Sequence, residues 1–135
     1  MTVHDYVSFL LINDSTLLVN KSCLEKKIKP ESFNFPSFNI KLGENKEDAL
    51  VRIFNEELNI NPTSYKFLCS VYQPGAELKH IHYYIVSDWE DKNSIRTASE
   101  STWYPLQHNL PLGIKSDKVA IAEYQKQMSN ENPML

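Results

Sequence analysis

The segment EDALVRIFNEELNI, residues 47–60, decides how the rest of the chain is interpreted. An α-helix over this segment places its apolar side chains on one stripe about 100° wide, which is the face expected to contact a core. The stripe consists of Leu50, Val51, Phe54 and Leu58. The same helix places Glu56 and Glu57 off the stripe, on either side of Ile53. A hydrocarbon between two carboxylates raises the question of what that position once supplied.

Length and composition favour a single globular domain over residues 1–135. Hydrophobic residues make up 41% of the chain and charged residues 23%, with a formal charge of −3 and a pI near 5.8, which argues against a surface built for nucleic acid or anionic lipid. No apolar run is long enough to span a membrane, and the first residues lack the pattern of a signal peptide. Two cysteines do not suggest a disulfide framework or a zinc site. We expect a cytoplasmic protein.

Short apolar and aromatic runs predict the strands. Residues 7–12 and 16–20 indicate a hairpin, and residues 64–73 and 80–89 indicate two further strands. The remaining segments are a polar loop at 21–32, an extended stretch at 33–42 with Pro36 at an edge or bulge, and a short strand at 100–106. With helices between and after the strands, this order predicts an α/β fold in which a mixed β-sheet lies between helices.

Capping residues mark the two predicted helices. Asn45 is a good N-cap for the first helix, and Asn59 can adopt the left-handed conformation that ends it. Ser116 is expected to cap a second helix over residues 116–128, beyond which residues 129–135 form a frayed tail. The apolar stripe of this second helix is Ala120, Ile121, Tyr124 and Met128.

The acidic side chains of the first helix suggest a metal site. Glu56 and Glu57 share a face within about one turn, and Glu44 and Glu47 lie nearby in the sequence. Carboxylates of this kind suit Mg²⁺ or Mn²⁺, which takes one or two of them and completes its shell with water and substrate phosphates. The alternative is an exposed helix whose acids are simply solvated.

Residues 38–60 resemble the signature of the Nudix hydrolases. That signature reads Gly, five residues, Glu, seven residues, Arg-Glu, a hydrophobic residue, any residue, Glu-Glu, any residue, Gly and a hydrophobic residue. The matching positions are Glu44, Arg52, Phe54, Glu56, Glu57 and Ile60. Three positions depart from it: Phe38 and Asn59 replace the glycines, and Ile53 replaces the glutamate of Arg-Glu. The order of elements over residues 4–128 also resembles MutT-type members, which implies a Nudix-type α/β/α sandwich.

The resemblance implies cleavage of a diphosphate linkage in a nucleoside diphosphate derivative, with Mg²⁺ or Mn²⁺. By position, Glu56 and Glu57 become the metal ligands, and Glu57 also belongs to the catalytic group. Arg52 becomes the residue that orients the glutamates, and Glu44 joins the same charge network. The ion would neutralise phosphate oxygens and lower the pKa of a bound water.

Residues 38–60 are called the box below. Ile53 makes this box degenerate, because the family places at that position a glutamate that faces the metal. Loss of a general base costs about 10²–10⁴ in rate, so we expect reduced or altered activity. Phe38 adds to this expectation, since the family's glycine lets the loop fold closely around the helix. Two alternatives stay open: a catalytically inactive Nudix-fold protein that binds a nucleotide or regulates, and an unrelated α/β protein with a coincidental helix.

Residues outside the box carry further predictions. Some family members hold the catalytic base on a loop, where Glu100 is the better candidate and Glu77 the weaker one. A solvated loop carboxylate explains Glu100 equally well and is the favoured interpretation of Glu77. Lys79 resembles a basic substrate contact. Asp117 resembles a position that reads a purine edge, although a helix dipole explains it as well.

The remaining aromatic and histidine residues are ambiguous. His80 and His82 share one strand face and could bind a metal, but no third ligand sits at a persuasive spacing, so hydrogen-bonded or surface histidines are favoured. Trp103 and Tyr104 could stack on a base, and more often such a pair belongs to a core. The sequence leaves open the substrate, the general base and whether the protein is a monomer or a homodimer.

Overall fold

The computed structural model describes residues 2–21, 32–90, 95–106 and 110–131. In chain order the elements are β1 (Val3–Asn13), β2 (Thr16–Lys21), β3 (Phe33–Asn34), β4 (Ser37–Asn39), α1 (Lys46–Ile53), the π-helical turn η1 (Phe54–Leu58), β5 (Asn61–Gln73), β6 (Leu78–Glu90), β7 (Ser101–Pro105) and α2 (Lys115–Glu131). None of the helices in these ranges is long and apolar enough to cross a lipid bilayer.

The strands form one mixed sheet, as predicted. Its order is β3-β2-β1-β6-β5, with β4 paired to β1 and β7 paired to β2. Strands β1 and β6 run parallel, from the pair Val3–Leu78 to the pair Leu11–Val86, and the other pairings are antiparallel. This long parallel pairing places the first residues of the chain beside a segment more than seventy positions later.

The predicted hairpin is confirmed, with longer strands than expected. Asn13 pairs with Thr16 across a two-residue turn, in which Asp14 adopts a left-handed φ of 58°. Aspartate tolerates this conformation better than most residues. Pro36 lies between β3 and β4, where it removes no hydrogen bond from the sheet. Strand β2 extends through Lys21, the first residue of the loop predicted over residues 21–32. Residues 22–31 of that loop lie outside the described part of the chain.

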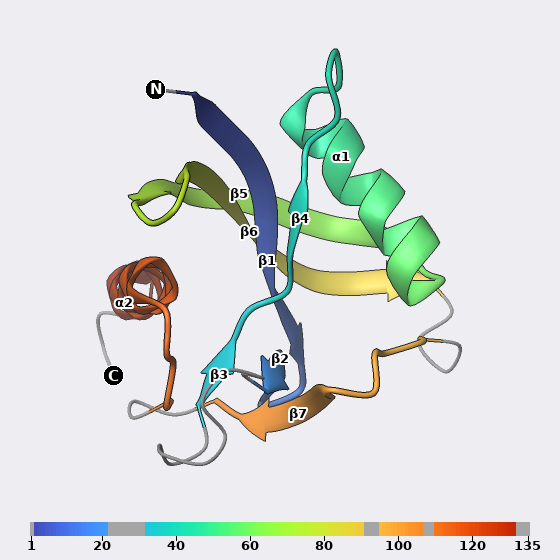
Figure 1. Ribbon diagram of the computed structural model, residues 1–135. Helices are drawn as coiled ribbons and strands as arrows, with labels where there is room; N and C mark the ends of the chain where they lie inside the picture. Colours follow the sequence, from blue (N-terminus) through green and yellow to red (C-terminus); the bar gives the residue numbers. More distant parts are fainter. Residues whose placement is uncertain (1, 22–31, 91–94, 107–109, 132–135) are drawn as a thin grey trace.

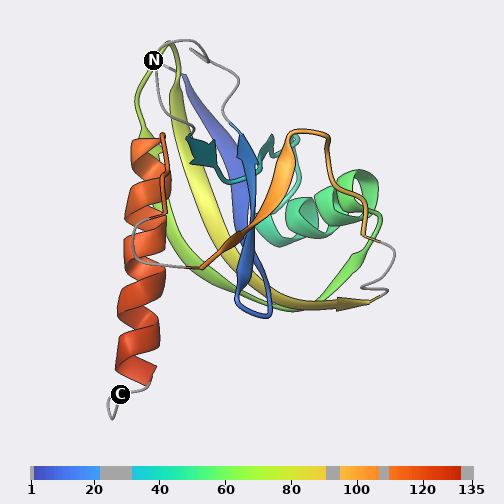
Figure 2. The same cartoon turned by 90° about the horizontal axis from the view of Figure 1, so that it is seen from below.

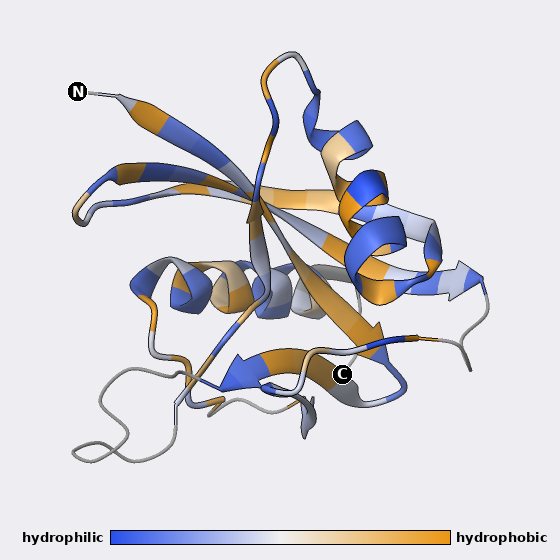
Figure 3. Ribbon diagram, turned by 45° about the vertical axis from the view of Figure 1, so that its right-hand side comes forward, coloured by the Kyte–Doolittle hydropathy of each residue, from blue (hydrophilic) through white to orange (hydrophobic). Residues whose placement is uncertain are grey.

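One helix covers each face of the sheet, as Figures 1 and 2 show. The alternation of side chains along the strands divides the core accordingly. One apolar cluster joins α1 and η1 to the sheet, and the other joins α2 to the opposite face. The middle of the sheet is strongly hydrophobic and the outer side of α1 is hydrophilic (Figure 3). The predicted arrangement of a mixed sheet between helices is therefore confirmed.

Helix α2 differs in detail from its prediction. It begins at Lys115, so Ser116 lies inside the first turn rather than at the cap. The backbone N–H of Ser116 donates to Gln73 Oε1 at 3.0 Å, so a side chain from β5 takes over the capping. At the other end the helix runs on through Glu131, into the segment predicted to fray, and Met128 is exposed instead of buried.

Candidate metal and diphosphate site on helix α1

The caps of the box helix are those that the sequence predicts. Asn45 Oδ1 accepts a hydrogen bond of 2.8 Å from the backbone N–H of Asp48. At the other end Asn59 adopts φ 59° and ψ 35°, and its N–H donates to the carbonyl of Phe54. Asparagine tolerates the left-handed conformation that the family's glycine supplies at this position. The replacement of glycine by Asn59 therefore leaves the end of the helix intact.

The expected position of Ile53 is wrong. The sequence placed its side chain outside the apolar stripe, between two carboxylates, whereas the structure leaves it only 1% exposed. It belongs to the cluster that joins α1 to the sheet, together with Val7, Phe9 and Leu50. Val51, assigned to the stripe, is only half-buried. Burial of the hydrocarbon is reason enough for isoleucine at this position, because it removes apolar surface from water.

Ile53 lies in the regular helix, three residues after the buried Leu50. The π-helical turn that follows sets the directions of Glu57 and Leu58. Leu50 and Glu57 are seven residues apart, so a continuous α-helix would place both on one face. Leu50 is fully buried and Glu57 is exposed. The turn from Phe54 to Leu58 is wider than an α-helical turn, because its hydrogen bonds run from i to i+5. The wider turn rotates Glu57 away from the core and Leu58 into it.

Arg52 joins two box glutamates. Its Nε donates to Glu44 Oε2 at 2.7 Å and its Nη2 to Glu44 Oε1 at 3.0 Å, which is a bidentate pair. Its Nη1 donates to Glu56 Oε1 at 3.3 Å, and Nη2 also reaches the carbonyl of Asn39 at 3.2 Å. Hydrogen bonding to the Arg52 guanidinium lowers the pKa of Glu44, and the same contact raises the pKa of Arg52. The contact therefore keeps Glu44 and Arg52 charged.

Glu56 and Glu57 form the open part of this face. Both are exposed, and within the described ranges the Glu57 carboxylate makes no hydrogen bond or ion pair. An oxygen-only donor set of one or two carboxylates is what Mg²⁺ or Mn²⁺ takes when substrate phosphates and water complete its shell. The two side chains therefore fit such an ion, while Ile53 supplies no third carboxylate.

The backbone at Phe38 does not call for glycine. Phe38 lies in β4 opposite Val7, its φ is not positive, and its ring packs against the cluster under α1. The left-handed residue of this loop is Gly43, with φ +82°. Because Gly43 supplies the turn, Phe38 is compatible with a well-folded loop and the doubt attached to it from the sequence has no structural basis.

The segment before β7 is fastened to the end of the box helix. Arg96 donates from its backbone N–H to the carbonyl of Leu58 at 2.9 Å and from Nη2 to the carbonyl of Glu56 at 2.8 Å. A cation is favourable at a helix C-terminus. Glu100 follows four residues later, with an exposed side chain and a carbonyl that accepts from Lys21 N–H at 2.9 Å. Sequence reasoning missed Arg96, because no pattern places it beside the box.

The two predicted substrate contacts lie on the other side of the sheet. Lys79 alternates with Ile81 and Tyr83 onto the α2 face, and its Nζ lies 4.8 Å from the centre of the Tyr6 ring. Asp117 lies in the first turn of α2. The structure therefore joins Glu44, Arg52 and Glu56 by direct contacts and leaves Glu57 exposed next to Glu56 in the chain. It separates Lys79 and Asp117 from them.

Asp117 is a buried, fully engaged carboxylate. It is 4% exposed; its Oδ1 accepts from Tyr83 Oη at 2.6 Å, and its Oδ2 accepts from the N–H of Phe35 at 3.0 Å. Tyr83 Oη also lies 2.9 Å from Ser116 Oγ. Burial raises the pKa of Asp117 to about 6, against the two hydrogen bonds that favour its ionised form.

The other candidate residues have structural partners. Glu77 accepts from Tyr6 Oη at 2.8 Å and pairs with His4 at 3.5 Å. Trp103 and Tyr104 lie in β7, half-buried, and pack against the two opposite core clusters. A single base cannot stack on both rings, since they face opposite sides of the strand.

The mixed sheet between two helices, with a capped acidic helix on one face, is the architecture of the Nudix fold. A family model described as the NUDIX domain matches residues 2–124, and the chain belongs to this family. In general, members of this family are pyrophosphohydrolases that use a divalent metal ion. A comparison with curated protein sequences gives no significant match.

Solved structures agree on the fold. The E. coli ORF135 protein superposes with a TM-score of 0.78 at 17% identity, covering 98% of this chain and 95% of its own. A MutT Nudix hydrolase from Burkholderia pseudomallei gives 0.70 at 18% identity, with 91% and 98% covered. The Nudix domain of Shewanella oneidensis NrtR, solved in complex with ADP ribose, gives 0.61 at 15% identity, with 95% and 88% covered.

Proposed function

We propose that this protein hydrolyses a diphosphate linkage in a nucleoside diphosphate derivative, with an activity altered by the apolar residue at position 53. The observation that carries the proposal is the exposed Glu56–Glu57 pair beside an Arg52 that Glu44 holds in a bidentate contact. An exposed helix with merely solvated acids has no need of that clamp. A metal-binding face does, since its carboxylates must be held in one geometry.

Each residue of this face has a defined task. Glu56 and Glu57 would hold Mg²⁺ or Mn²⁺, which supplies neutralisation of phosphate oxygens and a bound water of lowered pKa. Arg52 positions Glu56 through the 3.3 Å contact of its Nη1. Glu44 in turn fixes the direction of the guanidinium, so the box acts as one network.

The proton acceptor comes from outside the box in this proposal. Ile53 cannot accept a proton, and its side chain is buried under the helix. Glu100 is our candidate, because Arg96 fastens the segment that precedes it to the carbonyl ends of the box helix and the Lys21 N–H contact fixes the Glu100 backbone. The Glu100 side chain is exposed, so its carboxylate can face a substrate bound at the C-terminal end of the box helix.

ADP ribose is the first substrate to test, since it is the ligand of the structurally similar NrtR Nudix domain. Product release would be followed for ADP ribose, nucleoside triphosphates and nucleotide sugars, with Mg²⁺ and with Mn²⁺. Wild type would be compared with Glu57→Gln, and with Glu47→Gln as the matched control, because Glu47 is an exposed glutamate on the same helix. Turnover that falls at least about 100-fold in Glu57→Gln and not in Glu47→Gln supports the proposal.

The buried Ile53 specifically favours a second candidate, a Nudix-fold protein that binds a nucleotide and performs no chemistry. Calorimetric titration with ADP ribose separates the two candidates. Binding by wild type with no product from any substrate would establish the second function and contradict the first. Activity that is lost in Glu100→Gln would establish the first and identify the base.

A further inference from the structure

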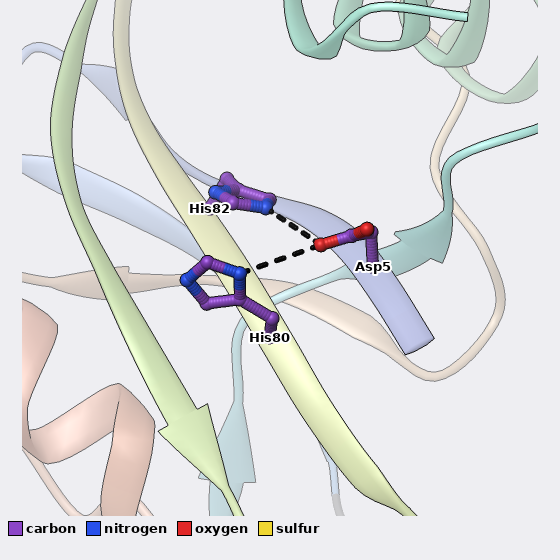
Figure 4. A group of neighbouring side chains, drawn as sticks. All are labelled: Asp5, His80 and His82. Atoms are coloured by element: carbon purple, nitrogen blue, oxygen red, sulfur yellow. Dashed lines mark hydrogen bonds and ion pairs between the residues drawn. The ribbon is translucent and has the colours of Figure 1, made fainter. Parts of the chain in front are cut away.

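A group of possible metal ligands lies outside the box, where β1 and β6 run parallel. Asp5 is the register partner of His80, and His82 follows two positions along β6 on the same face. His82 Nε2 lies 3.1 Å from Asp5 Oδ1, and His80 Nδ1 lies 3.4 Å from the same oxygen. Figure 4 shows the two rings converging on the carboxylate. In the part of the chain that the structure describes, no other three histidine, cysteine or acidic residues meet this closely.

The spacing suits a first-row transition metal. With bonds of about 2.0–2.1 Å, two ligands of a tetrahedral zinc ion lie roughly 3.3–3.4 Å apart. The two measured separations, 3.1 and 3.4 Å, are close to that edge length, and one ligand atom from each residue lies within 4.8 Å of the others.

Both imidazoles are held in place by other contacts. His82 Nδ1 hydrogen-bonds to Ser70 Oγ at 2.7 Å, which leaves Nε2 directed at Asp5. The His80 ring stacks on Tyr72 at 4.1 Å between centroids and 4° between planes. A contact on the second ring nitrogen is how metal-binding histidines are commonly oriented. The ligands are therefore ordered before an ion arrives.

The group is accessible from one side. The exposed fraction of the side chain is 54% for Asp5, 25% for His80 and 7% for His82. An ion would enter beside Asp5, and three protein ligands would leave a coordination position towards solvent. The positive charge of Lys46, at the start of α1, also acts on His82 and opposes a cation. The Asp5 carboxylate is needed to offset it.

We propose that Asp5, His80 and His82 bind one first-row transition-metal ion of the Zn²⁺ class, with an open coordination position facing solvent. The site is separate in chemistry from the Glu56–Glu57 pair, because imidazole nitrogen favours zinc and its neighbours whereas carboxylates alone favour magnesium. The proposal does not depend on hydrolase activity. It requires only the folded chain.

The test is metal binding by the full chain without nucleotide. Zn²⁺ titration by calorimetry gives affinity and stoichiometry, and the visible absorption of bound Co²⁺ reports the ligand geometry. We expect saturation at one ion per chain at micromolar metal. His80→Gln and Asp5→Asn should each weaken binding by more than about 10-fold, and Ser70→Ala by about 10-fold. These positions are preferred to the buried His82, whose substitution endangers folding.

Two control variants make the result specific. His4→Gln removes an imidazole from β1, the strand that also holds Asp5, where His4 pairs with Glu77. Glu57→Gln removes the exposed acid of the box helix. Both should bind Zn²⁺ as wild type does, with unchanged circular dichroism in all variants. Absence of saturable binding, binding that persists in His80→Gln, or binding lost in Glu57→Gln would each overturn the proposal.

Discussion

The acidic residues on the two faces of the sheet differ in burial and in hydrogen bonding. On the α1 side the Glu44–Arg52 pair contacts Glu56, and the carboxylates of Glu56 and Glu57 are exposed to solvent. On the α2 side Asp117 is enclosed, and its two oxygens accept from Tyr83 and from the Phe35 backbone. The exposed oxygens of Glu56 and Glu57 can bind a ligand. Both oxygens of Asp117 already accept hydrogen bonds within the fold.

The comparison separates acids that support function from acids that support structure. A buried carboxylate is expensive unless it is fully hydrogen-bonded, so Asp117 ties α2 to β6 at a cost that appears as a raised pKa. An exposed carboxylate costs little and stabilises little, so Glu56 and Glu57 can serve a ligand without loss to the fold. Substitutions on the two sides should therefore differ in what they change.

The largest expected effect is at Ile53, which lies beneath the exposed acids. Ile53→Glu puts a carboxylate in the core cluster and should lower the free energy of unfolding by at least about 3 kcal/mol. Urea denaturation measures the change. Ile53→Leu is the control and should cost less than about 1.5 kcal/mol. A fully stable Ile53→Glu protein would show that this position can face solvent or metal after all.

The next effect is the pH dependence contributed by Asp117. Its pKa of about 6 in the folded protein exceeds the ordinary 3.8, so the folded state binds the proton more tightly. Its favourable contribution is complete below about pH 3.8 and is lost as the pH rises through 6. The loss should amount to at most about 3 kcal/mol.

Asp117→Asn isolates this contribution from those of the other carboxylates. The difference in unfolding free energy between wild type and the variant should favour wild type more at pH 4 than at pH 7.5. Above about pH 7 this difference in unfolding free energy should no longer change with pH. A difference that is constant from pH 4 to 7.5 would mean that Asp117 titrates normally and is not enclosed.

The clamp between Glu44 and Arg52 should have a smaller effect. Glu44→Gln replaces a charged acceptor by a neutral one and should destabilise by about 1 kcal/mol, because the pair is only partly shielded from water. Chemical denaturation at low and at high sodium chloride tests this, and the difference should shrink as salt screens the pair. An effect that salt leaves unchanged would point to packing in place of charge.

The smallest expected stability effect is at Glu57. Glu57→Gln should change the free energy of unfolding by no more than about 0.5 kcal/mol, because the side chain is exposed. Thermal unfolding without metal measures it. The same substitution should abolish the rise in melting temperature that Mg²⁺ or Mn²⁺ causes, if these residues hold the ion. A large loss of stability in Glu57→Gln without metal would show that Glu57, like Asp117, supports the fold and contradict this prediction.

The sequence by itself determined much of this protein. Spacing from Glu44 through Arg52 to Ile60 predicted the family, and apolar periodicity predicted the hairpin, the mixed sheet and both helices. The predictions that Asn45 and Asn59 cap the first helix are confirmed, because a cap depends on the local preference of one residue type. Such signals are carried by neighbours in the chain, so they can be read without the fold.

Tertiary structure decided which side chains face which environment. Ile53 looked like a lost acid because Val51 was assigned to the apolar stripe, whereas contact with the sheet buries Ile53 and leaves Val51 only half-buried. Asp5 joins His80 and His82 only because β1 and β6 pair in parallel. Contacts between residues far apart in the chain leave no periodic trace in the sequence, and the packing of the sheet alone created them.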